Sequence, residues 1–144
     1  MPAEQVFSLE EVNALVPELT RVVGRQLDRR ARIETLLDEL ADITGARGDV
    51  KVRPSDSSDV RQQKRELARR IDEYHQGWTH VEDMGGVLKD PREGLVDFYG
   101  RMGARIVWLC WKFGEKQVNH YHQLDEGFSG RKRIEEPHRR ILLN

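Results

Sequence analysis

The sequence predicts an α+β fold: a long antiparallel helical hairpin, coiled-coil-like, capped by a small three-stranded antiparallel β-meander. Two apolar seams with helical spacing run from Val12 to Ile43 and from Val60 to Val81, and a segment of alternating residues begins after Gly94. At 144 residues the chain fits one domain. We expect the hairpin over about residues 8–85, the β cap over about 86–131 and a basic tail over 132–144.

The first helix has a clear start signal. Ser8 and Glu11 form a capping box, and Phe7 and Val12 stand where a hydrophobic staple forms. Pro17 has no amide hydrogen, so we expect a kink or a short lead-in helix there, with the long helix running from about Pro17. Glycines after residue 44 end it.

The seam of this helix contains eight apolar residues among ten positions and is polar only at Gln26 and Arg29. Residues 45–59 are rich in Gly, Asp, Ser and Pro, which predicts a mobile connector. A second helix follows, and two helices joined in this way most simply pack antiparallel. Lys64 in its seam faces the connector end, where we expect its charge to reach water.

Three strands are expected in the cap. Alternation predicts strands over residues 94–99, 105–113 and 117–122, with glycine-containing turns between them. In the middle strand Val107, Leu109 and Trp111 would share one face, and Trp108 and Cys110 the other.

Composition narrows the class of protein. Charged residues make up 34% of the chain but the net charge is −1, so nothing in the totals points to nucleic acid. The single Cys110, in an apolar run, excludes an internal disulfide and indicates a buried, inert thiol. No apolar stretch approaches the roughly 20 residues of a membrane span, and no signal peptide is evident, so we expect a cytoplasmic protein.

One candidate site is a divalent-metal centre. His120 and His122 share a strand face, and Asp97 on the first strand and Asp125 after the third strand add carboxylates. Imidazole and carboxylate ligands suit zinc or manganese.

A second candidate is an anion pocket formed by Lys112, His122 and Arg131, with Asp125 orienting the imidazole. The alternative to both candidate sites is that these residues only stabilise the fold. In that case Asp125 pairs with Arg131 or caps its turn, and Asp97 faces water or a cation on the neighbouring strand.

Two classes of function follow. The first is a non-enzymatic interaction module that dimerises, or binds a protein partner, through its helices. The second is a ligand- or metal-binding protein with its site in the β cap. Whether it is an enzyme stays open, because no serine or cysteine has the context of a nucleophile.

Several segments resemble one bacterial family, the domain of unknown function 2203. The resemblance covers roughly Phe7 to Arg131, and its most distinctive element is the pattern His-x-x-Asp-x-Gly-Phe-x-Gly-Arg over residues 122–131. The opening segment over residues 7–19 is similar too. The resemblance supports the order of the elements and implies no activity.

Overall fold

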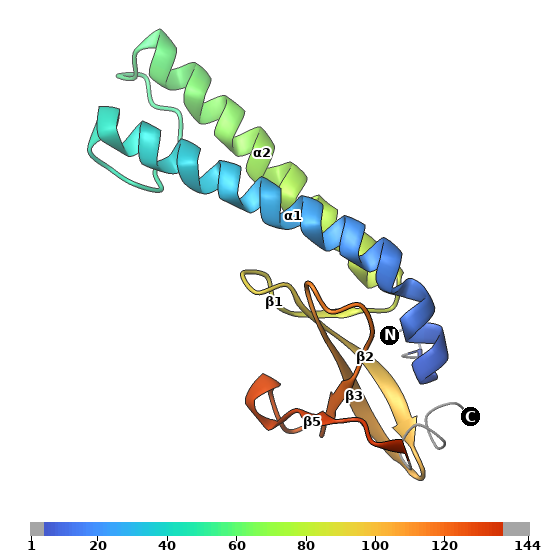
Figure 1. The fold of residues 1–144 in the computed structure, drawn as a ribbon. Helices are drawn as coiled ribbons and strands as arrows, with labels where there is room; N and C mark the ends of the chain where they lie inside the picture. Colours follow the sequence, from blue (N-terminus) through green and yellow to red (C-terminus); the bar gives the residue numbers. More distant parts are fainter. Residues whose placement is uncertain (1–4, 137–144) are drawn as a thin grey trace. The chain divides into compact units, whose positions relative to one another are not determined.

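A computed structural model describes residues 5–136 and confirms the α+β class (Figure 1). The helices are α1 (Leu9–Thr44) and α2 (Ser58–Asp83). A 3-10 turn, η1, covers Phe128–Gly130. The strands are β1 (Val87–Asp90), β2 (Leu95–Met102), β3 (Arg105–Lys112), β4 (His120–His122) and β5 (Lys132–Arg133).

The chain divides into two compact units. The hairpin unit is Arg25–Thr79, and the sheet unit comprises the described parts of Met1–Gly24 and His80–Asn144. Both helices therefore contribute to both units. The single domain over residues 1–144 stays a prediction, and the predicted tail over 132–144 lies outside the described residues beyond residue 136.

In the hairpin unit the two helices run antiparallel, as predicted (Figure 1). The buried side chains there include Ile33, Leu40, Leu67 and Tyr74. Gln26, one of the two predicted polar seam positions, is fully buried and donates from Nε2 to the Tyr74 carbonyl over 2.5 Å. Because this polar side chain is satisfied by the facing helix, it costs little and fixes how the helices align.

The prediction that Lys64 reaches water was wrong. Its side chain is buried, and Nζ donates to an Asp56 carboxylate oxygen and to the Lys51 carbonyl, each over 2.9 Å. Asp56 and Lys51 belong to the connector, which we predicted to be mobile. A buried ammonium requires such partners, so Lys64 gives the connector defined contacts.

The start of α1 follows the predicted capping box. The Ser8 amide donates to Glu11 Oε1 over 2.8 Å, and the Glu11 amide donates to Ser8 Oγ over 3.1 Å. Of the two alternatives predicted at Pro17, a kink or a short lead-in helix, the separate lead-in helix was wrong, because α1 is continuous from Leu9. Buried side chains on both sides of Pro17, among them Val16 and Leu19, keep the helix in one piece despite the missing amide hydrogen.

The sheet is a meander of five antiparallel strands in the order β1-β2-β3-β4-β5. Strands β2, β3 and β4 overlap the three predicted strands, although β4 covers only the last three residues of the predicted range 117–122. The predicted number of three strands was too small, because β1 and β5 were not predicted. Strand β1 has four residues and β5 two, too few to show alternation in the sequence. Strand β2 extends to Met102, and Gly103, with φ of 63°, makes the turn to β3.

Alternation gives the sheet two faces. Phe98, Leu109, Trp111 and Tyr121 lie on the first face, all of them buried. Phe7 packs edge-on against Phe98 with ring centroids 5.3 Å apart. This apolar face forms the core of the sheet unit, and the second face carries the polar residues described below.

We predict that Gly77→Ala destabilises the protein although alanine favours helices. A Cβ at Gly77 would lie 2.1 Å from Gln26 Oε1, and Gln26 is held by the Tyr74 carbonyl and by Arg29. The free-energy cost of this overlap should exceed the gain in helix propensity. The free energy of unfolding, measured by urea denaturation, should fall by about 1–2 kcal/mol.

The control for this prediction removes the nearer of two obstructing side chains; the other is the flexible end of Arg29, whose Nη1 would lie 2.7 Å from the new Cβ and is released when Gln26 is removed. In a Gln26→Ala background, Gly77→Ala should be neutral or stabilising. An equal loss in both backgrounds would contradict the steric explanation.

Candidate functional site

The second face of the sheet brings together residues from three strands. Asp97 on β2 is paired with Cys110 on β3, and Cys110 is paired in turn with His120 on β4. His122 lies two residues further along β4, opposite Trp108. Because paired residues and i, i+2 neighbours project from the same face, Asp97, Cys110 and His122 are close in space.

Asp97 and His122 form a buried pair. Both side chains are 2% exposed, and His122 Nε2 lies 2.8 Å from Asp97 Oδ2. His122 Nδ1 lies 3.0 Å from the Gln123 carbonyl, which can only accept, so Nδ1 carries a hydrogen. Since Nε2 and a carboxylate oxygen repel each other without a hydrogen between them, this pair holds a proton.

The other oxygen of the Asp97 carboxyl, Oδ1, has no strong hydrogen-bond donor in the described part of the chain. Oδ1 is buried and unpartnered among the described residues, and the neighbouring Cys110 thiol is only a weak donor. Burial raises the pKa of the Asp97 carboxyl above its ordinary value, against the opposing influence of His122, a hydrogen bond from the Cys110 thiol and the charge of Lys89. The site therefore holds a poorly solvated carboxyl with one free oxygen.

Cys110 completes the cluster. One ligand atom each from Asp97, Cys110 and His122 all lie within 4.8 Å of one another. Burial, followed by the charge of Asp97, raises the pKa of the Cys110 thiol to about 12. An Arg131 guanidinium nitrogen lies 3.7 Å from the sulfur and opposes that rise. The thiol is buried and protonated, as the sequence indicated.

The cluster forms part of a pocket with a volume of about 310 Å³. The residues that line the pocket come from β1, β2, β3, β4 and the segment after β4; they are Lys89, Asp90, Leu95, Asp97, Cys110, His122, Glu126, Gly127 and Phe128. The Lys89 ammonium lies 3.9 Å from the centre of the Trp108 ring, which stacks on Tyr99. The three-residue cluster is thus open to a space that can hold a small ligand.

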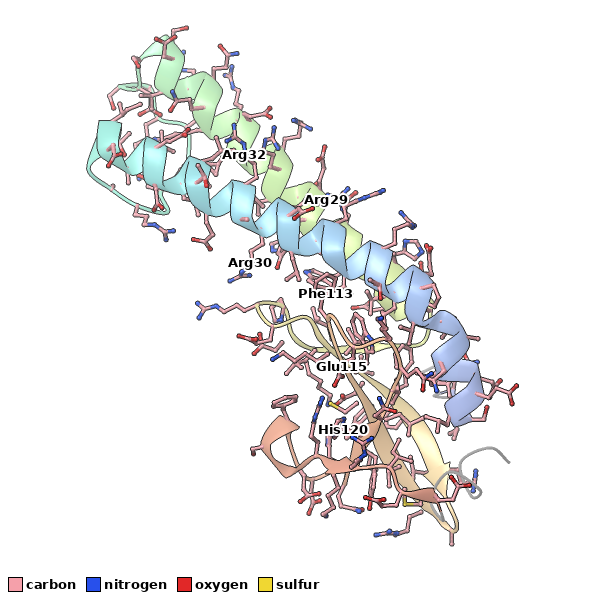
Figure 2. The ribbon with its side chains drawn as sticks, in the orientation of Figure 1. Arg29, Arg30, Arg32, Phe113, Glu115 and His120 are labelled. Atoms are coloured by element: carbon pink, nitrogen blue, oxygen red, sulfur yellow. The ribbon has the colours of Figure 1, made fainter. Side chains whose placement is uncertain are left out.

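The structure places His122 and Asp97, but not the other predicted metal ligands, in this cluster. His120 is on the same face, but its Nδ1 lies 3.8 Å from a Glu115 carboxylate oxygen instead (Figure 2). Burial lowers the pKa of His120. Asp125 is exposed and does not line the pocket.

Of the residues predicted for an anion pocket, Lys112 and Arg131 both lie near the Phe128 ring, but each also faces a carboxylate. Arg131 pairs with Glu115, its Nη2 lying 2.6 Å from Oε2, and not with Asp125. The guanidinium also lies over the Phe128 ring, 4.5 Å from its centre. Lys112 Nζ lies 3.6 Å from Glu93 Oε2. Each of the two predicted cations therefore already faces a carboxylate.

The sequence interpretation missed Cys110 and Lys89 as members of the site. The signal for Cys110 was present, because alternation along β3 already set it on the face opposite to Leu109. The register between β2 and β3, which puts it beside Asp97, could not be read from the sequence. Lys89 lies on β1, a strand that was not predicted.

The fold and the cluster define a class of protein: an α+β chain with a buried Asp-Cys-His group on one face of an antiparallel meander. No helix within residues 5–136 is long and apolar enough to cross a membrane. The chain belongs to the family described as "Uncharacterized conserved protein (DUF2203)", which matches residues 5–134 and confirms the resemblance read from the sequence. Neither curated proteins nor solved structures provide a match.

We predict that Cys110 resists thiol reagents in the folded protein. A rise in pKa from 9.0 to about 12 lowers the thiolate fraction at pH 8 by roughly a thousandfold, and burial adds a further barrier. The rate of reaction with a disulfide reagent should therefore be at least about a thousandfold lower than in concentrated urea. Similar rates in the two conditions would show that Cys110 is accessible and ionised.

Proposed function

We propose that this protein binds a small cationic ligand in the pocket beside Asp97, Cys110 and His122. The observation that carries the proposal is the buried Asp97 Oδ1, which has no hydrogen-bond partner among the described residues. A buried polar atom without a partner costs about 1–3 kcal/mol. Such a cost is most simply explained by a ligand that supplies the missing contact.

The charges around the pocket favour a cation. Three of the lining residues are carboxylic acids, Asp90, Asp97 and Glu126, and Lys89 is the one lysine among them. The two cations predicted for an anion pocket, Lys112 and Arg131, lie beside Glu93 and Glu115. Lys132 in turn lies 3.9 Å from Glu126, and Asp97 shares a proton with His122, so the unpartnered Asp97 Oδ1 supports the proposal more than the total charge of the pocket does.

The chemistry of the pocket is consistent with binding rather than with a specific reaction. Both ring nitrogens of His122 are engaged, one with Asp97 and one with Gln123. The imidazole therefore has no nitrogen available to act as a base toward a ligand. While that proton stays in place, Asp97 Oδ1 and the Cys110 sulfur are the groups that can contact a ligand directly, and His122 Nε2 is accessible only to a ligand that displaces the proton.

We predict that Asp97→Asn abolishes cation binding while preserving the fold. The introduced amide can donate to Nε2 of His122, because Nδ1 already carries the imidazole hydrogen. The free energy of unfolding without ligand should change by less than about 1 kcal/mol. The carboxylate, and with it the attraction for a cation, is lost.

The measurement is thermal unfolding with zinc, magnesium, calcium and butylammonium chlorides. A ligand at a hundred times its dissociation constant adds about 2.7 kcal/mol of stability, which raises Tm by about 5–10 °C for a chain of this size. Asp125→Asn is the matched control, because Asp125 is exposed and outside the pocket, and it should keep the rise. If no cation raises Tm in a manner that depends on Asp97, the proposal fails.

A second candidate is self-association through the helices, the interaction module predicted from the sequence. The hairpin unit has a groove of about 310 Å³ with Leu36 and Leu67 between acidic and amide side chains; its other lining residues are Glu39, Asp59, Gln62, Gln63 and Glu66. Exposed arginines such as Arg32 (Figure 2) and Arg65 on the same unit supply the opposite charge on a second copy.

For this candidate we predict a salt-sensitive dimer that Glu39→Arg weakens by about tenfold or more. Sedimentation velocity on the full chain measures it. Asp42→Arg makes the same charge change at an exposed position outside the groove and should leave the dimer intact. A monomer at all concentrations and salt conditions would contradict self-association.

A further inference from the structure

We infer that the cation is a divalent transition-metal ion of the zinc type, held by the Asp97 carboxylate, the Cys110 thiolate and His122 Nε2. This inference rests on the proposed function, since it names the ligand of the same pocket. It replaces the metal set predicted from the sequence by adding Cys110 and leaving out His120 and Asp125.

The positions of the three ligand atoms support it. In a tetrahedral zinc site the metal–ligand distances of about 2.0–2.3 Å place neighbouring ligand atoms roughly 3.3–3.8 Å apart. The three atoms here all lie within 4.8 Å of one another, and Nε2 and Oδ2 are 2.8 Å apart. An ion therefore requires the separations of these atoms to change by up to about 1.5 Å, which rotations of the three side chains can supply.

The hydrogen bond of His122 is the one that a metal-binding histidine makes. Such histidines donate from one ring nitrogen to a backbone carbonyl or carboxylate, which directs the lone pair of the other nitrogen at the metal. His122 Nδ1 faces the Gln123 carbonyl, so its Nε2 lone pair is directed toward Asp97. A metal ion would replace the proton that now has to lie between these two groups.

The donor set selects among metals. A thiolate, an imidazole and a carboxylate favour zinc over magnesium, calcium or manganese, which prefer oxygen ligands. The nearby Arg131 guanidinium, 3.7 Å from the Cys110 sulfur, suits a thiolate better than a thiol. Binding would displace two protons, one from the thiol and one shared by Asp97 and His122.

The cluster provides three protein ligands, and the fourth position would face the pocket. Three protein ligands with an open position characterise zinc sites that bind water or an exogenous ligand, whereas structural sites have four. The neighbouring space of about 310 Å³ is large enough for such a ligand. The site we infer is therefore one that exposes its metal to small molecules.

The test is equilibrium dialysis of the untagged full chain against zinc, followed by elemental analysis, with cobalt absorption as a second readout. The parent should bind about one zinc per chain, and its cobalt form should show thiolate-to-metal charge transfer. Asp97→Asn, Cys110→Ser and His122→Gln should each weaken zinc binding by about tenfold or more. Cys110→Ser should also remove the charge-transfer band.

His120→Gln and Asp125→Asn are the matched controls, since both were plausible ligands from the sequence and neither belongs to the cluster. Both should bind zinc like the parent. If the parent binds no zinc, or binds it equally after Cys110→Ser and His122→Gln, the inference is overturned. Stabilisation by butylammonium that depends on Asp97, without zinc binding, would overturn the inference and leave the proposed function intact.

Discussion

The pairing of β2 with β3 is the constraint on which the rest of the sheet unit depends. Eight residue pairs join Leu95–Met102 to Arg105–Lys112 without a break in register. This register sets Asp97 beside Cys110 on one face and Phe98 beside Leu109 on the other. A shift by one residue would exchange the two faces, burying charge in the apolar core and moving the polar cluster away from its partners.

Both faces of strands β2 and β3 are mostly buried. The cluster of Asp97, Cys110 and His122 on the second face is therefore shielded from water, although its residues are polar. A two-sided antiparallel sheet of this size commonly has one face in water. Here the segment after β4, with Gly127 and Phe128, forms part of the wall of the pocket on the second face. Asp97 and His122 are consequently withdrawn from solvent while a space remains beside them.

The sequence predicted the parts of the fold that depend on local patterns. The capping box at Ser8 and Glu11, the two helices and the three longer alternating segments needed only neighbouring residues. The parts that were wrong depend on distant contacts. Pro17 stays within α1 because packing outweighs one lost hydrogen bond, and Lys64 is buried because Asp56 from the connector meets it.

The same distinction applies to the site. His122 and Asp97 were found because their residue types suggested chemistry, but their partners were misassigned. Arg131 lies nearer in the sequence to Asp125 than to Glu115, yet it pairs with Glu115. Sequence distance is a poor guide on a meander, since strand register decides which side chains meet.

The wall of the pocket also bears on how the protein is made. Asp97 and His122 are separated by 25 positions, and the covering segment is followed by β5, which pairs with β4, and by the buried Ile134. A ribosome releases the helices and the first strands before any of this cover exists. A nascent chain that has emerged only as far as β3 therefore lacks His122 and the covering segment, so the pocket can form only after synthesis has passed Phe128.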